Sequence, residues 1–142
     1  MKCSEIMTPD PVLCIPSDPV SMAARLMRDH DIGSIPVTND RKSRRLVGIV
    51  TDRDIALSIV AEERDPGGTV VGDVMTPDPI TCRPGDDIES VMNTMKRSQL
   101  RRIPVTDGSG ELVGMVAQAD LAVHCRDADK TADVLAAVSR PA

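Results

Sequence analysis

The chain of 142 residues contains no Phe, no Tyr and no Trp. Platforms that bind single-stranded nucleic acid and cages that bind quaternary ammonium groups both depend on aromatic faces for stacking or cation–π attraction. Neither kind of site is therefore expected here, and a bound base would have to lie between aliphatic side chains. Apolar residues still make up 41% of the chain, so we expect a folded protein with an aliphatic core.

The sequence also lacks an excess of basic residues. Lys and Arg total 17 against 22 Asp and Glu, which gives a formal charge of −5, and this charge disfavours a nucleic-acid partner. No apolar run approaches the roughly 18–20 residues that cross a bilayer, and the first residues lack the apolar stretch of a signal peptide. We therefore expect a cytoplasmic protein with no membrane partner.

The four cysteines show no C-x-x-C spacing; they are Cys3, Cys14, Cys82 and Cys125. We expect them to be small buried apolar residues rather than disulfides or metal ligands, so no metal site and no required cofactor is predicted. The sequence also has no Gly-rich P-loop and no H-E-x-x-H helix, and its two histidines belong to no nucleophile constellation. It is not predicted to be an enzyme.

An internal repeat is the most informative feature that is present. A shift of 68 places residues 6–12 (IMTPDPV) on residues 74–80 (VMTPDPI), and residues 35–38 (IPVT) on residues 103–106 (IPVT). With the shift reduced to 66, residues 46–48 (LVG) fall on residues 112–114 (LVG), and Asp54 falls on Asp120. A fixed self-similarity of this kind indicates a duplicated structural unit.

In both copies, short apolar runs that indicate strands and stretches with helical spacing of apolar residues follow one another in the same order. This order predicts that each copy folds as strand, helix, strand, strand, helix. The strands are expected at residues 12–15, 35–38 and 46–51, and in the second copy at residues 80–82, 103–106 and 112–116. The first helices are expected to begin at caps formed by Asp18 and Asp86. The second helices are expected at residues 52–63 and 118–126. The fold class is α+β, with repeats at 1–63 and 74–126, a linker at 64–73, and a tail at 127–142 with a possible short helix at 130–139.

The motifs of the two copies closely resemble those of the CBS domain, two of which in tandem form a CBS pair or Bateman module. The resemblance rests on the Met-Thr-Pro-Asp-Pro opening of each copy, the Ile-Pro-Val element, and the run LVGIVTDRDI at residues 46–55. It implies repeats packed with pseudo-two-fold symmetry in a stand-alone sensor, and a homodimer built as a disc of four CBS units. It also implies an adenosine-containing ligand: AMP, ADP, ATP, S-adenosylmethionine or NAD.

The segment from Gly48 to Asp54 matches the ribose and phosphate motif of that family. A carboxylate such as that of Asp54 accepts hydrogen bonds from ribose hydroxyls, and the Thr51 hydroxyl with free helix amides favours a phosphate. The same two residues also fit a helix N-cap with an acidic residue at its third position. The residues by themselves leave both interpretations open.

The second copy differs at this motif, since Ala117 replaces the threonine while Asp120 keeps the carboxylate. Before the Ile-Pro-Val element the asymmetry is reversed: the first copy has Gly33 and Ser34, and the second has Arg101 and Arg102. The resemblance implies that each site combines the two copies. The main site would consist of Ile49, Thr51, Asp54, Thr81, Arg101 and Arg102, and a weaker second site of Leu13, Gly33, Ser34 and Asp120.

Two functions are consistent with these features. The first is a non-enzymatic regulatory module for signal transduction that binds an adenosine nucleotide and acts on a protein that the sequence does not name. The alternative is a constitutive interaction or assembly protein with a vestigial nucleotide site. Stabilisation by an adenosine compound distinguishes the two, because only the first binds one.

Overall fold

The computed structural model describes residues 1–124 and 128–139, and its chain divides into two compact units. Unit 1 contains Met1–Asp10, Ile80–Ser109 and Val113–Ala142, and unit 2 contains Pro11–Pro79 and Gly110–Leu112. The units therefore do not coincide with the two sequence repeats, because the first ten residues belong to the unit built mostly from the second repeat.

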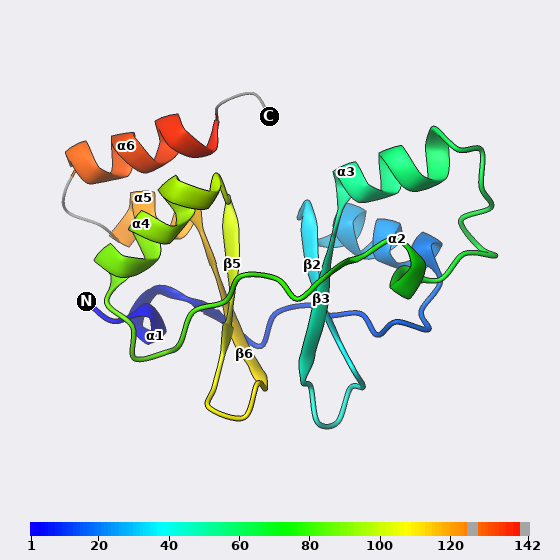
Figure 1. Cartoon of the computed structure of the whole chain (residues 1–142), viewed down its shortest axis with the longest axis horizontal. Coiled ribbons are helices and arrows are strands. Elements are labelled where there is room, and N and C mark those ends of the chain that lie inside the picture. Colours follow the sequence, from blue (N-terminus) through cyan, green and yellow to red (C-terminus); the bar gives the residue numbers. More distant parts are fainter. Residues whose placement is uncertain (125–127, 140–142) are drawn as a thin grey trace. The chain divides into compact units, whose positions relative to one another are not determined.

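Unit 2 is built on a three-stranded antiparallel sheet in the order β2-β3-β4, with β2 at Ser34–Thr38, β3 at Leu46–Thr51 and β4 at Thr76–Pro77. Its helices are α2 (Val20–His30) and α3 (Asp52–Ile55), which continues into a π-helical segment at Ala56–Val60. A short 3-10 turn, Val71–Asp73, precedes β4. Figure 1 shows β2 and β3 as a hairpin with α3 leaving the end of β3.

Unit 1 repeats this arrangement with the sheet order β1-β6-β5, formed by Thr8–Pro9, Leu112–Ala117 and Arg102–Thr106. Its helices are α1 (Cys3–Ile6), α4 (Ile88–Ser98), α5 (Gln118–His124) and α6 (Ala128–Val138). In Figure 1, α6 lies beside α4, which it contacts. Along the chain, the predicted order of strand, helix, strand, strand, helix is confirmed in both repeats.

Each repeat contributes its Met-Thr-Pro segment to the sheet of the other repeat. Thr8 and Pro9 pair with Met115 and Gly114 of β6, and Thr76 and Pro77 pair with Ile49 and Gly48 of β3. The partner strand carries a glycine at each crossing, because a Cβ at Gly48 would lie 2.6 Å from the Met75 sulfur. A Cβ at Gly114 would lie equally close to the sulfur of Met7.

The strands predicted at residues 12–15 and 80–82 are wrong in position. The structure places the first strand of each repeat earlier, at Thr8–Pro9 and Thr76–Pro77, and leaves only single parallel bridges, from Cys14 to Val37 and from Cys82 to Val105. Proline explains the short ladders, since each proline removes an amide donor, and residues 9–16 (PDPVLCIP) and 77–84 (PDPITCRP) each hold three prolines.

The predicted helix starts also need correction. Pro19 and Asp87 occupy the N-cap positions of α2 and α4, and neither makes a side-chain cap hydrogen bond. Asp18 and Asp86 instead close the preceding turns, where their Oδ2 atoms accept from the amides of Ile15 (3.0 Å) and Arg83 (2.8 Å). These carboxylates therefore bond to the turn before the helix rather than to the amides at the helix start.

The later helices agree with the prediction in position but not in length. The helix predicted at 52–63 ends with the π-helical segment at Val60, where the amide of Ala61 donates to the carbonyl of Ala56 at 2.9 Å. The helix predicted at 118–126 is α5, which is described to His124, and the last two predicted residues lie outside the described residues. The tail helix predicted at 130–139 is α6.

The core is aliphatic and forms one cluster in each unit. The unit 1 cluster surrounds Met95, Ile103 and Leu121, and the unit 2 cluster surrounds Val20, Ile35 and Val50, all of which are essentially inaccessible to solvent. Cys3, Cys14 and Cys82 are buried in these clusters as free thiols, which confirms the prediction that they are buried apolar residues. Cys125 lies outside the described residues.

Candidate functional site

The candidate site in unit 2 lies where β3 ends and α3 begins. Thr51 is the N-cap of α3, and its hydroxyl oxygen accepts from the Asp54 amide at 3.0 Å. In return, Asp54 Oδ2 accepts from the Thr51 amide at 2.9 Å. This reciprocal pair is a capping box, and it fixes both side chains at the start of the helix. The N-cap that the sequence left open as an alternative is therefore present.

The start of β2 completes this end of the unit 2 sheet. Ser34 pairs with Thr51 across the hairpin, and the Gly33 carbonyl accepts from the Asp52 amide at 2.9 Å. The Ser34 hydroxyl is buried and has no hydrogen-bond partner among the described residues. A buried polar group without a partner costs about 1–3 kcal/mol, so a water or a ligand group at this hydroxyl would lower the free energy of the folded state.

The equivalent end of unit 1 carries different side chains on the same backbone. Asp120 Oδ2 accepts from the Ala117 amide at 2.8 Å, but Ala117 has no hydroxyl to return the bond. The Arg101 carbonyl accepts from the Gln118 amide at 2.9 Å, as that of Gly33 does from Asp52. This end of the unit therefore has half of the capping box and gains two guanidinium groups, those of Arg101 and Arg102.

Gln118 is a polar residue of this region that the sequence analysis missed. Its side-chain carbonyl oxygen is buried without a hydrogen-bond partner within residues 1–124 and 128–139. The repeat alignment contained a signal for it, because Gln118 takes the position of Asp52, directly after the strand that ends the motif. The two orphan polar groups, Ser34 Oγ and Gln118 Oε1, thus both lie at the ends of the hairpins where the sequence places its sites.

The other predicted site residues divide between the units. Unit 2 holds Ile49 on β3, half-buried between its partners Pro36 and Thr76, and Leu13 just before the bridge at Cys14. Unit 1 holds Thr81, exposed beside Cys82, whose amide donates to the Pro104 carbonyl of β5 at 3.1 Å. Both predicted sites draw on the two units, so each of these combinations stays a prediction.

No metal centre was predicted, and the described residues contain no group of three or more His, Cys, Asp or Glu side chains that could hold a metal ion. Within the same part of the chain, no helix is both long and apolar enough to cross a membrane.

The tandem sheets with exchanged first strands and the motif at the end of β3 define a class of protein, the CBS domain proteins. The CBS domain profile matches residues 3–61 and 71–127, and the chain belongs to this family with two CBS domains.

Among curated proteins, the chain is similar to the CBS domain-containing protein YhcV of Bacillus subtilis (strain 168). The two are 36% identical over 135 residues, which is 95% of this chain and 93% of YhcV. Among solved structures, it resembles the crystal structure of Hypoxic Response Protein I with two coordinated zinc ions. That comparison has a TM-score of 0.78 and 32% identity, and it covers 87% of this chain and 98% of the other.

A second structural relative was solved with a nucleotide. The crystal structure of CBSX2 in complex with AMP matches with a TM-score of 0.73 and 27% identity, over 86% of this chain and 93% of that chain. CBSX2 is a CBS-pair protein from Arabidopsis thaliana.

Proposed function

We propose that this chain is a non-enzymatic regulatory module whose two CBS domains bind an adenosine-containing nucleotide. The observation that carries the proposal is the capping box of Thr51 and Asp54 at the start of α3 beside the orphan hydroxyl of Ser34. The similarity to CBSX2, solved with AMP, supports the choice of an adenosine ligand.

The capping box assigns a role to each side chain. Asp54 uses Oδ2 for the Thr51 amide, which leaves Oδ1 to accept from the hydroxyls of a ribose. The Thr51 oxygen accepts from the Asp54 amide, so its hydroxyl hydrogen remains to be donated to a phosphate oxygen. The cap therefore orients the two groups before the ligand arrives, and binding does not have to pay the entropy of ordering them.

We assign the phosphate contacts to Arg101 and Arg102 and a supporting contact to Thr81. A guanidinium binds phosphate oxygens in a bidentate manner, and Gly33 and Ser34 at the equivalent positions of the first repeat offer no such charge. Ile49 supplies aliphatic surface for the base, since the chain has no aromatic ring to stack on it. The second site, with Leu13, Gly33, Ser34 and Asp120, is weaker because it lacks both the hydroxyl and the guanidinium groups.

The first experiment is scanning calorimetry of the full chain with AMP, ADP, ATP, S-adenosylmethionine and NAD. A ligand present at 100 times its dissociation constant stabilises the folded state by about 2.7 kcal/mol. At least one compound is expected to raise the melting temperature in proportion to the logarithm of its concentration. If none of the five does so, the result contradicts the proposal and favours the alternative function as an assembly protein.

The second experiment tests the residues by isothermal titration of the best ligand. Asp54→Asn keeps an oxygen for the Thr51 amide but removes the charge, and we expect a loss of affinity of about tenfold or more, in line with a hydrogen bond to a charged group. Asp120→Asn is the matched control and is expected to change the affinity by less than about threefold. The reverse order of effects would invert the assignment of the two sites.

An assembly surface accompanies this function. Leu57 in unit 2 and Val123 in unit 1 are equivalent across the repeat, and they are 52% and 78% exposed, while Val60 is 71% exposed. Exposed apolar side chains at equivalent helix positions favour association of two copies. We expect light scattering to give twice the 15.2 kDa of one chain, and Leu57→Glu to give the monomer mass. A monomeric wild-type protein would contradict this.

A further inference from the structure

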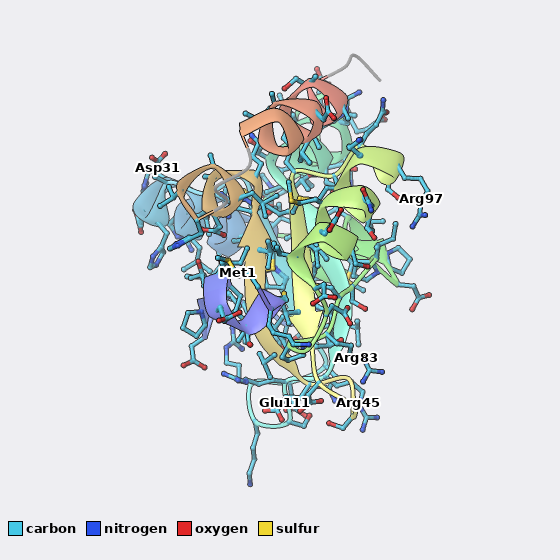
Figure 2. The ribbon with its side chains drawn as sticks, turned by 90° about the vertical axis from the view of Figure 1, so that its left-hand side faces the viewer. Met1, Asp31, Arg45, Arg83, Arg97 and Glu111 are labelled. Carbon is cyan, nitrogen blue, oxygen red and sulfur yellow. The ribbon has the colours of Figure 1, made fainter. Side chains whose placement is uncertain are left out.

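Two buried thiols in unit 1 meet although they are 79 positions apart in the sequence. Cys3 opens α1, the short helix beside the labelled Met1 in Figure 2, and Cys82 bridges to β5 at Val105. Their sulfur atoms lie 3.4 Å apart, and the side chains are 0% and 7% exposed in the core cluster of unit 1. The thiol of Cys82 also faces the Pro104 carbonyl, at the longer distance of 4.0 Å.

The backbone, rather than the thiols, brings these side chains together. The Cys3 amide donates to the Asp86 carbonyl at 2.8 Å, and the Ser4 amide donates to the Pro84 carbonyl at 3.0 Å. These two bonds attach the first residues of the chain to the segment that follows Cys82. The sulfur–sulfur contact is therefore a fixed feature of the folded unit.

Unit 2 shows that packing does not require the second thiol. Val71 occupies the position of Cys3, and its amide donates to the Asp18 carbonyl at 2.8 Å, as that of Cys3 does to Asp86. Val71 shares the unit 2 core cluster with Cys14, the equivalent of Cys82. A valine fills the equivalent place in unit 2, so the cysteine in unit 1 adds chemistry that the fold does not need.

The contact makes the two thiols unequal. The hydrogen bond from Cys82 lowers the pKa of the Cys3 thiol, and the same bond together with burial raises the pKa of Cys82. Since the thiolate is the nucleophile, the Cys3 sulfur is the one that reacts first with an oxidant. The Cys82 sulfur then attacks the oxidised Cys3 sulfur.

We infer that Cys3 and Cys82 form a reversible disulfide when the protein reacts with a peroxide, and that this bond links the segment Met1–Asp10 covalently to the rest of unit 1. In the first step the Cys3 sulfur attacks the peroxide, the O–O bond breaks, and a sulfenic acid and water (from hydrogen peroxide) result. In the second step the Cys82 sulfur attacks the sulfenic sulfur, the S–S bond forms, and a second water leaves. Two thiols are oxidised and one peroxide is reduced.

Local opening of α1 gives the oxidant its access, because neither sulfur is exposed in the folded unit. The helix has only four residues, and a single helical turn opens more readily than the core. We therefore expect the reaction to be slower than that of a free thiol and to speed up in urea concentrations well below the unfolding transition. Once formed, the disulfide prevents the segment that contains α1 and β1 from separating from the sheet.

The test treats the full chain with hydrogen peroxide, alkylates the remaining thiols in denaturant and maps the tryptic peptides by mass spectrometry. Trypsin leaves Cys3 and Cys14 on one peptide, residues 3–25, and Cys82 on residues 65–96. Fragment ions that separate Cys3 from Cys14 are therefore needed. We expect a link between Cys3 and Cys82 that dithiothreitol removes. A link through Cys14 in equal yield, or Cys3 and Cys82 both alkylated after treatment, would overturn the inference.

A matched variant separates the disulfide from general oxidation. Cys3→Val copies the arrangement of Val71 with Cys14 and is expected to fold. Peroxide is expected to raise the melting temperature of the wild type by about 10 °C, because the bond closes a long loop in the unfolded chain, and dithiothreitol should reverse the shift. The variant is expected to show no such shift. An equal shift in both proteins would overturn the inference, and the peptide map of the wild type decides the question if the variant fails to fold.

Discussion

The two units use one backbone plan with different side chains at a few positions. The same four interactions occur in both. An amide in the segment before the Met-Thr-Pro motif donates to a carbonyl in the loop before the first long helix, and the first amide of that helix donates back to a carbonyl of the segment. One Asp side chain closes the turn before the helix, and another accepts from the amide at the junction between the last strand and the next helix. In unit 1 the residues that take part are Cys3, Ile88, Asp86 and Asp120, and in unit 2 they are Val71, Val20, Asp18 and Asp54.

The differences lie at the hairpin ends and in the exchanged segments. Unit 2 has the full capping box, and unit 1 has the two arginines and the thiol pair. A duplicated backbone leaves such positions free to change, because the hairpin ends lie outside the core clusters and the core accepts either Cys3 or Val71 at equivalent positions. The comparison therefore separates residues that maintain the fold from residues that are candidates for function.

The largest effect is expected where the exchanged strands cross. An added Cβ at Gly48 would lie 2.9 Å from the Thr76 carbonyl oxygen, and one at Gly114 would lie 3.0 Å from that of Thr8, so backbone has to move in both variants. We expect Gly48→Ala and Gly114→Ala each to lower the free energy of unfolding by about 2–3 kcal/mol in urea titrations. Gly85→Ala is the control, since no atom lies within 4 Å of its added Cβ. Loss of stability in only one of the two crossing variants would break the equivalence of the units.

The next effect concerns Cys14, which, unlike Cys82, contacts no other cysteine among the described residues. Burial and the nearby Asp18 raise the pKa of Cys14 from 9.0 to about 11. Between these values the unfolded chain has lost the Cys14 proton that the folded chain keeps, so the stability that Cys14 contributes is constant below about pH 9 and falls above it. Relative to Cys14→Val, the wild type is expected to lose about 2 kcal/mol by pH 11 in urea titrations. Parallel pH profiles for the two proteins would contradict this, and no tyrosine titrates in this range to obscure the difference.

The smallest effect concerns the capping box. Thr51→Ala removes the acceptor for the Asp54 amide and is expected to cost about 1 kcal/mol of unfolding free energy. Ala117→Ser makes the opposite change in unit 1, where Asp120 already accepts from residue 117, and is expected to gain about 0.5 kcal/mol. Thermal unfolding followed by circular dichroism measures both. If the serine variant is no more stable, the two junctions differ in more than the hydroxyl.

Much of the fold was predictable because the duplication doubled every local signal. The hairpins, the amphipathic helices α2 and α4, and the junction at Thr51 and Asp54 all follow from the hydrophobic period and from turn residues that act over a few positions. The first strands were not predictable, because Thr8–Pro9 and Thr76–Pro77 are strands only through their pairing with a distant segment. Asp18 and Asp86 were misassigned as caps because a turn and an N-cap use the same residue type.

The α+β class, the repeated unit, the aliphatic core imposed by the lack of aromatics, and the motif residues at the end of β3 all follow from local sequence patterns. Three features emerge only from the folded chain: which segments pair with the sheet of the other repeat, the orphan polar atoms of Ser34 and Gln118, and the contact of Cys3 with Cys82. Local patterns reflect interactions between residues a few positions apart, whereas these contacts join segments up to 107 positions apart, as in the pair of Thr8 and Met115, which meet only when the whole chain has folded.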